Sequence, residues 1–407
     1  MPQDSFMHLY AYDAVRTQPS PIREICNLVN QPDMRSLAGG WPDPKIFPLE
    51  EITEIIIDLL RDWGKKVFQY GSTEGLLELR QELARMACEE GDVECEPEEI
   101  LITHGSAQGM DLASRVFVER GDVIMVELPS YFGAFGAVNS SGGDVVGVSM
   151  DKDGLDTGAL VKKIRQFKKN GSQIKGVYVI PNFQNPTGLT MGLERRKHLI
   201  ELAEEFDLMI FEDDPYRELR FEGEQIPSLK SMDRSGRVIH LRSLSKNFVP
   251  GIRVAWLSAK DSVIRRMVIM KQFVDVCTNT LGQYIVFEFI RRGLLKRRLP
   301  LLIAHYRQKR DLMLKLLDNH FPEEVRWTRP SGGFFIWVEL PEEMDAMELL
   351  AEAIGRKVIF VAGGPFFANG GGINTMRLSY SQVDEEAMEM AVAELGYLIK
   401  RRLCCTS

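Results

Sequence analysis

The stretch VIHLRSLSKNFVPGIRVAWLSA, residues 238–259, decides how we interpret this chain. The apolar runs at its two ends are typical of β-strands, and the polar segment between them carries Lys246, Arg253 and two serines. A solvent-exposed hairpin needs only a two-residue turn without special chemistry. Because the connection is too short for a crossover, the two strands should pair antiparallel. Two cations at such a strand end indicate a site, whose nature depends on what else reaches Lys246.

Upstream of this stretch, short β-branched runs alternate with helix-length segments. This alternation is typical of a mostly parallel sheet with crossover helices. Several runs are apolar almost throughout, as expected for strands that are covered on both faces. The sequence therefore predicts an α/β unit with a seven-stranded sheet in which one strand is antiparallel. The predicted strands are EILITHG (99–105), DVIMVELPSY (122–131), DVVGVSMD (144–151), GVYVIPN (176–182), LMIFEDD (208–214), VIHLRSLS (238–245) and RVAWLSA (253–259).

The pattern changes after residue 260, where long helical stretches lead to strands and a closing helix. This order predicts a second, smaller α+β unit. The predicted helices span 106–119, 157–170, 192–206, about 261–292, 295–319 and 384–402, and the later strands lie at GGFFIWVEL, VIFVAGG and TMRLSYS. We expect three regions, namely an N-terminal arm and part of the small domain at 1–60, a large domain at 61–295 and a C-terminal small domain at 296–407.

Composition argues against several classes of function. The 407 residues are 44% hydrophobic, enough for a substantial core, and the net charge of −8 gives no attraction for nucleic acids or anionic membranes. No apolar run reaches the length of about eighteen residues that suggests a spanning helix, and the N-terminus lacks the features of a signal peptide, so we expect a cytoplasmic protein. The six cysteines and six histidines show no metal-ligand spacing, so no metal is predicted.

Ligands bind at the carboxyl ends of the strands in an open parallel sheet, so the residue types found there indicate function. THGSAQG (103–109) places Ser106 and Ala107 at the start of a helix, where free N–H groups and the helix dipole favour phosphate. An N-cap serine without further function is the alternative. VIPNFQNPTG presents the amide of Asn185 at the next strand end, although a structural turn would explain it equally well.

EDDPY (212–216) adds the carboxylate of Asp213 and the phenol of Tyr216 at a further strand end. Buried carboxylates are costly unless something positive meets them. With the amine of Lys246, these strand ends supply the groups that pyridoxal phosphate requires, including an acid partner for its ring nitrogen and a lysine for its Schiff base. Arg253 can clamp the phosphate, whereas Lys246 must lose its proton to form an imine.

The motifs NPTG, EDDPY, SLSK with Arg253 seven residues later, and MRLSYS resemble those of the class I, fold type I pyridoxal-phosphate aminotransferases. The resemblance runs from SLAGGWPDPKIFP to GGPFFANGGGINTMRLSY, nearly the whole chain. These two end motifs are most similar to the 2-aminoadipate and kynurenine aminotransferase group, especially its bacterial lysine-biosynthesis type. The resemblance implies a homodimeric enzyme of amino acid metabolism. The acidic composition described above predicts that it binds no nucleic acid and no membrane.

The resemblance also implies roles for the matching residues. Lys246 would form the Schiff base, Asp213 would keep the ring nitrogen protonated, and Asn185 and Tyr216 would hydrogen-bond the 3′ oxygen. The other implied cofactor contacts are Ser106, Ala107 through its N–H, Tyr131, Ser243, Ser245, Arg253 and, across the dimer interface, Tyr70.

Arg377 resembles the arginine that holds the substrate α-carboxylate, with a surface salt bridge as the alternative. Asn185 and Gly40 complete the implied substrate contacts. Arg23 matches an arginine that reaches a distal carboxylate of glutamate or aminoadipate in similar enzymes, and an exposed arginine on an N-terminal helix is the alternative. Because the group also accepts aromatic and branched side chains, 2-oxoglutarate as acceptor is better indicated than any one donor.

The predicted activity is ping-pong transfer of an amino group from an L-amino acid to a 2-oxo acid. A lyase or decarboxylase that uses the same cofactor is an alternative, since fold does not settle function. The pair of Arg377 and Lys246 favours transamination. A second alternative is a non-catalytic regulator, because aminotransferase-like domains also occur behind a winged helix. This acidic chain begins directly at the aminotransferase region, which disfavours that alternative.

Overall fold

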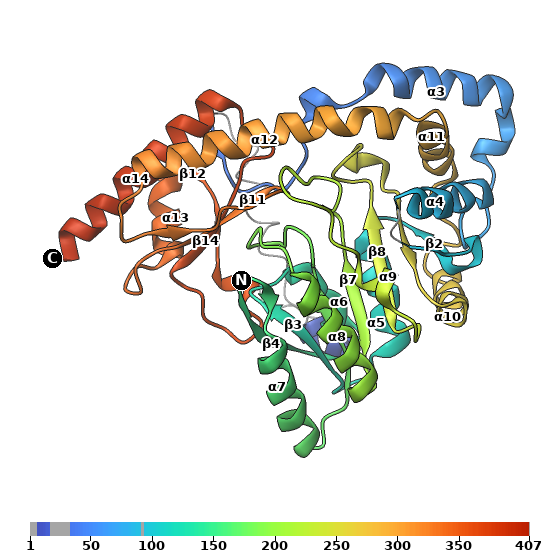
Figure 1. Cartoon of the computed structure of the whole chain (residues 1–407), viewed down its shortest axis with the longest axis horizontal. Helices are drawn as coiled ribbons and strands as arrows, with labels where there is room; N and C mark the ends of the chain where they lie inside the picture. The colour runs from blue at the N-terminus through green and yellow to red at the C-terminus, as the bar shows by residue number, and fades with distance from the viewer. Residues whose placement is uncertain (1–5, 17–32, 91–92, 407) are drawn as a thin grey trace.

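The computed structural model describes residues 6–16, 33–90 and 93–406. A large unit and a smaller one lie side by side (Figure 1). The long helix α12 (Leu294–His320) runs along both of them (Figure 1). Among the described residues, no helix combines the length and the apolar character needed to cross a membrane.

The large unit is built on an eight-stranded sheet with the order β2-β9-β8-β7-β6-β3-β4-β5. β9 runs antiparallel to both of its neighbours, and the central strands are parallel. All seven predicted strands are present, so the α/β prediction is confirmed. The eighth strand, β5, pairs antiparallel with β4 at the edge and was not predicted, because two residues carry no periodicity. The strands are β2 Ile100–Thr103, β3 Val123–Leu128, β4 Asp144–Asp151, β5 Gly154–Leu155, β6 Ile174–Val179, β7 Met209–Asp213, β8 Val238–Ser243 and β9 Ala255–Ser258.

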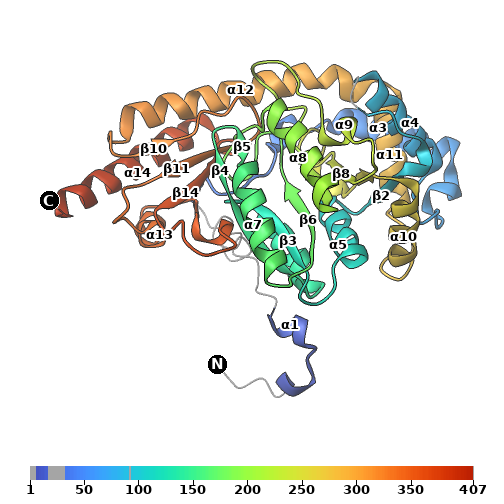
Figure 2. The same ribbon diagram turned by 60° about the horizontal axis from the view of Figure 1, so that its bottom comes forward.

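Helices cover both faces of this sheet. Successive strand residues point to opposite faces, so Ile124 and Val126 of β3 join one apolar cluster while Val123 and Met125 join another. The first cluster includes residues of α5 (Ser106–Phe117), α6 (Phe132–Ser140) and α10 (Asp261–Gln272). The second includes residues of α7 (Thr157–Lys169), α8 (Leu193–Phe206) and α9 (Leu229–Met232) (Figure 2). Burial on both faces explains why the strands are apolar almost throughout.

The helix predicted at 261–292 is interrupted. Residues 273–279 separate α10 from α11 (Thr280–Arg291), and Val276 in this loop has a φ of 63°. A β-branched residue in that conformation cannot continue a right-handed helix. α11 packs with α3 (Leu49–Asp62) and α4 (Leu77–Glu89) in a third apolar cluster, beside β2 and β9.

The smaller unit contains a four-stranded antiparallel sheet with the order β10-β11-β14-β13. Its strands are β10 Arg326–Trp327, β11 Phe335–Glu339, β13 Val361–Ala362 and β14 Thr375–Ser379, and its helices include α13 (Ala346–Gly355) and α14 (Glu385–Thr406). β1 (Arg35–Ser36) pairs with β12 (Val358–Ile359), whereas α3 packs against the large unit. The boundaries at residues 60 and 295 stay a prediction. The remaining elements in the described part of the chain are α1 (Tyr12–Arg16) and the 3-10 helices Met7–Leu9, Pro44–Ile46, Gly64–Phe68, Pro97–Glu99, Pro250–Ile252 and Gly364–Phe366.

Candidate active site

A cavity of about 360 Å³ lies where the central parallel strands end. Almost all of the predicted site residues line it, although they come from both units. They are Gly40, Ser106, Ala107, Tyr131, Asn185, Asp213, Tyr216, Ser243, Ser245, Lys246, Arg253 and Arg377. Tyr70 does not line the cavity, and its side chain is 80% exposed. Arg23 lies outside the described residues.

Lys246 follows β8 and extends its amine into this cavity. Its Nζ donates a hydrogen bond to the carbonyl of Gly40 at 2.8 Å and lies 5.8 Å from the centre of the Tyr216 ring. Burial, together with the cationic Arg377, lowers the pKa of Lys246 to about 8. A buried amine that loses its proton this readily is suited to act as a nucleophile and as a base.

Asp213 ends β7 with one carboxylate oxygen bonded and the other free. Its Oδ2 accepts a hydrogen bond from the phenol of Tyr178 at 2.7 Å, while Oδ1 has no partner among the described residues. Burial raises the pKa of Asp213 to about 6, against the opposing effect of Tyr178. A buried carboxylate oxygen needs a donor, and the protonated ring nitrogen of pyridoxal phosphate is a donor of the right kind.

Tyr178 was not predicted from the sequence as a site residue. Its Cα pairs with that of Phe211, which lies two residues before Asp213 and therefore on the same face of the sheet. Side chains alternate between the two faces of the sheet along β6 and β7. This alternation places Tyr178 beside Asp213 only once the register of the two strands is known.

Ser106, Ala107, Ser243, Ser245 and Arg253 form what we call the anion pocket. The first two open α5, whose free backbone N–H groups and dipole favour an anion. The hydroxyl of Ser243 donates to that of Ser245 at 3.0 Å. The guanidinium of Arg253 occupies the space where a side chain on Gly105 would lie, so the absence of that side chain lets the cation approach the helix end. These donors suit a phosphate group.

Arg377, on β14, is 1% exposed, which excludes the surface salt bridge considered above. Its Nη1 donates to Oδ1 of Asn185 at 2.8 Å, and its Nη2 donates to the carbonyl of Ala38 at 2.7 Å. Nε has no partner among the described residues. Burial lowers the pKa of Arg377 to about 10, so the guanidinium remains charged at neutral pH. A buried cation without a carboxylate partner in the described part of the chain fits a carboxylate on the ligand.

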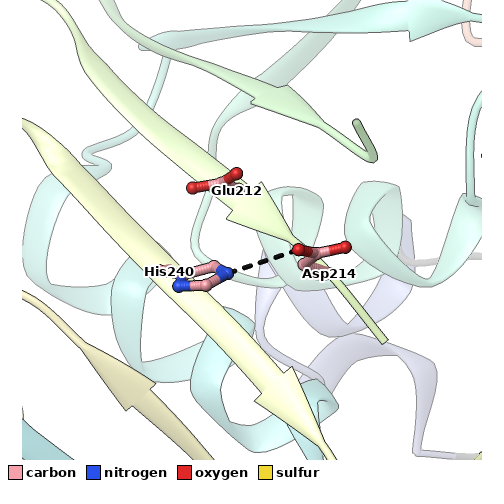
Figure 3. A group of neighbouring side chains, drawn as sticks. All are labelled: Glu212, Asp214 and His240. Carbon is pink, nitrogen blue, oxygen red and sulfur yellow. Dashed lines mark ion pairs between the residues drawn. The ribbon is translucent and has the colours of Figure 1, made fainter. Parts of the chain in front are cut away.

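The face of the sheet opposite to Asp213 carries a second group of titratable side chains, namely Glu212 on β7, Asp214 directly after it and His240 on β8 (Figure 3). The spacing in the sequence did not reveal them as a group, because they meet only across β7 and β8. Three such side chains can hold a metal ion. Glu212 accepts two backbone hydrogen bonds. Oδ2 of Asp214 accepts no hydrogen bond from the described residues but lies 3.8 Å from Arg217 and 3.6 Å from His240, so we infer charge compensation and propose no metal site. The partners are the N–H groups of Leu229 and Lys230 for Glu212, and Asn182, Arg217 and His240 for Asp214.

Comparison with known proteins agrees with this geometry. A family model described as aminotransferase class I and II matches residues 40–395. The chain belongs to this family. It is a pyridoxal-phosphate-dependent aminotransferase of fold type I, and the free oxygen of Asp213, the amine of Lys246 and the anion pocket fit that cofactor.

Three similar aminotransferases cover nearly the whole chain. The aromatic-amino-acid aminotransferase 1 of Thermococcus litoralis is 40% identical over 97% of this chain and 94% of its own. The structure of the kynurenine aminotransferase of Pyrococcus horikoshii is 38% identical, with a TM-score of 0.94 over 98% of this chain and 99% of its own. The structure of LysN, the alpha-aminoadipate aminotransferase of Thermus thermophilus, is 40% identical, with a TM-score of 0.90 over 98% of this chain and 100% of its own.

Proposed function

We propose that this aminotransferase transfers the amino group of an L-amino acid to a 2-oxo acid, with 2-oxoglutarate as acceptor, in a ping-pong reaction. The observation that carries this proposal is the presence of Lys246 and Arg377 in one cavity. An amine with a lowered pKa and a buried guanidinium that has no carboxylate partner among the described residues supply a base and a carboxylate clamp. One site with these two groups can take both substrates in turn, because each carries an α-carboxylate beside the reacting carbon.

We assign the residues as follows. Pyridoxal phosphate, when bound, withdraws electrons from the substrate and makes its Cα proton acidic. Lys246 would hold the cofactor covalently and later accept the Cα proton, while Asp213 would hold the proton on the ring nitrogen. Asn185 and Tyr216 would donate to the 3′ oxygen, and the anion pocket would hold the phosphate. Arg377 would orient the α-carboxylate so that the Cα–H bond faces Lys246.

Several kinds of side chain are proposed for the amino donor, namely acidic, aromatic and branched. Trp41, Phe132 and Phe335 line the same cavity and offer apolar contact. Aromatic amino acids, kynurenine and aminoadipate appear in the names of the similar enzymes. For glutamate and 2-aminoadipate we propose that Arg23 receives the distal carboxylate.

We also propose a cytoplasmic homodimer in which Tyr70 reaches the phosphate of the neighbouring subunit. The side chains of Tyr70, Phe68 and Phe273 are 80%, 66% and 86% exposed, and large exposed apolar residues are typical of surfaces that a partner covers. The hydroxyls of Thr73 and Thr280 donate to the carbonyls of Val276 and Gln69, which ties the segment around Tyr70 to the loop that contains Phe273.

The half-reaction tests the proposed activity. Holoenzyme mixed with glutamate, without any oxo acid, should lose the absorbance of the aldehyde cofactor and gain that of the pyridoxamine form. One equivalent of 2-oxoglutarate should appear without ammonia. Release of ammonia with no pyridoxamine form would instead support the lyase alternative.

Replacing Arg377 by lysine should weaken substrate binding. Lysine keeps the charge but cannot donate through two parallel N–H groups, so we expect KM for amino acids to rise by about 100-fold. Steady-state kinetics measure this change, and the absorbance of the bound cofactor serves as the control because it should not change. An unaltered KM for both substrates would contradict the assigned role.

Replacing Arg23 by alanine tests the choice of side chain. We expect kcat/KM to fall by about tenfold or more for glutamate and 2-aminoadipate, because a desolvated carboxylate loses its donor. Leucine and phenylalanine carry no distal charge and should be affected far less. Equal losses for all four amino acids would assign Arg23 a structural role.

A further inference from the structure

A chain of hydrogen bonds connects a buried lysine on α10 to the backbone just before α5, where the anion pocket begins. Lys271, near the end of α10, is 0% exposed, and its Nζ donates to Oδ1 of Asp275 at 2.8 Å. Oδ2 of Asp275 accepts a hydrogen bond from Nε2 of Gln108 at 2.8 Å. Oε1 of Gln108 in turn accepts from the backbone N–H of His104, also at 2.8 Å. The chain therefore ends on the peptide that leads into α5.

Arg253 holds the next peptide unit, which joins His104 to Gly105. The carbonyl of His104 accepts a hydrogen bond from Nη2 of Arg253 at 3.4 Å. The next residue, Gly105, has a φ of 77° and lies against the same guanidinium. The orientation of the His104–Gly105 segment thus affects both the first N–H groups of α5 and the position of the Arg253 guanidinium.

Asp275 determines which way the amide of Gln108 points. A carboxylate paired with a buried ammonium group accepts hydrogen bonds and donates none, so only the NH₂ group of Gln108 can face it. The carbonyl of Gln108 must then face the N–H of His104. An uncharged amide at position 275 could bond to either the carbonyl or the NH₂ group of Gln108. Gln108 could then adopt both orientations, and only one of them accepts the hydrogen bond from the N–H of His104.

The loop that carries Asp275 has a strained backbone. The N–H of Cys277 donates to the carbonyl of Asp275 at 2.6 Å, around Val276 with its φ of 63°. Valine adopts this conformation only where its surroundings impose it, and such residues cluster at functional sites. The turn ends α10 beside the start of α5, where the carboxylate of Asp275 can reach Gln108.

We propose that Asp275 is a positioning residue for the cofactor phosphate, acting through Gln108 and supported by Lys271. This inference rests on the assignment of the anion pocket to the phosphate made under the proposed function. Asp275 is not proposed to contact the phosphate itself. It holds the donors of α5 and Arg253 in the geometry that binds the phosphate.

The test compares dissociation constants of the full-length chain for pyridoxal phosphate and for pyridoxal, which lacks the phosphate. Asp275→Asn and Gln108→Leu should each weaken the binding of pyridoxal phosphate by about tenfold and leave that of pyridoxal unchanged. Asp111→Asn is the matched control. It removes one carboxylate from α5, where Asp111 pairs only with the exposed Arg115 among the described residues, and it should change neither constant.

The double variant shows whether the two residues act in series. If Asp275 acts through Gln108, Asp275→Asn combined with Gln108→Leu should bind pyridoxal phosphate no more weakly than either single variant. Losses that multiply would overturn the proposal, and so would equal losses for pyridoxal. Should Asp275→Asn fail to fold, Gln108→Leu alone still decides, because an unchanged dissociation constant contradicts the proposed route.

The variant Arg253→Ala distinguishes two failures. One is that Asp275 does not position the phosphate donors, and the other is that the anion pocket does not hold the phosphate. If Arg253→Ala weakens binding of pyridoxal phosphate while Asp275→Asn and Gln108→Leu do not, only the positioning role is wrong. If Arg253→Ala also has no effect, the anion pocket does not hold the phosphate.

Discussion

Lys246→Ala should abolish transamination, with kcat/KM reduced by at least about 10⁴-fold, the upper end of what a positioned general base contributes. The variant loses both the covalent attachment of the cofactor and the base for the Cα proton. The protein should stay folded, because the substitution removes a buried cation whose only hydrogen bond within the described residues is to Gly40. Absorbance of the purified variant and turnover with glutamate measure the two losses separately.

Two controls accompany this variant. Lys260→Ala removes an exposed lysine after β9 and should leave activity and cofactor absorbance unchanged. A small primary amine added to Lys246→Ala supplies a base in solution and should restore part of the half-reaction. Full turnover by Lys246→Ala without added amine would show that another group performs the chemistry.

Asp213→Asn should lower kcat/KM by about 10³-fold while leaving the cofactor attached. Asparagine keeps the shape of the side chain but removes the charge, so a protonated ring nitrogen would no longer face a carboxylate. Without that proton the cofactor withdraws electrons from the substrate less well. The effect should appear in kcat and as a change in the absorbance of the bound cofactor.

The Asp213→Asn result has its own control in Tyr178→Phe. This variant removes the hydrogen bond to Oδ2 but keeps the carboxylate, so its loss of kcat/KM should be much smaller, about tenfold. Equal losses from the two variants would mean that the position of the side chain at 213 matters more than its charge. Unchanged kinetics in Asp213→Asn would contradict the role of the carboxylate.

The sequence predicts most of the fold because the large sheet is buried on both faces. The run of β3, for example, is apolar except for Glu127, and this signal needs no knowledge of what packs against the strand. β5 was not predicted because two residues are too few to show the alternation of apolar and polar side chains that indicates a strand. The break at Val276 was not predicted because helical periodicity continues on both sides, and only the backbone conformation of that residue interrupts the helix.

The site residues, too, could be predicted only where the local sequence pattern was sufficient. Side chains at strand ends, such as Asp213 and Lys246, were identified from their place in the chain, since parallel strands end at one edge of a sheet. Tyr178 and Asp275 were not. Both act through neighbours that are distant in the sequence, and their contacts depend on strand register and on a loop conformation that residue types alone do not determine.

We expect the ε-amine of Lys246 to carry the cofactor, with Asp213 opposite it. Reduction of the holoenzyme with borohydride fixes a covalent cofactor on its residue, and peptide mass spectrometry then locates it. We predict one phosphopyridoxyl group per chain, attached to Lys246. A group on another lysine, or no covalent group in an active enzyme, would contradict this prediction.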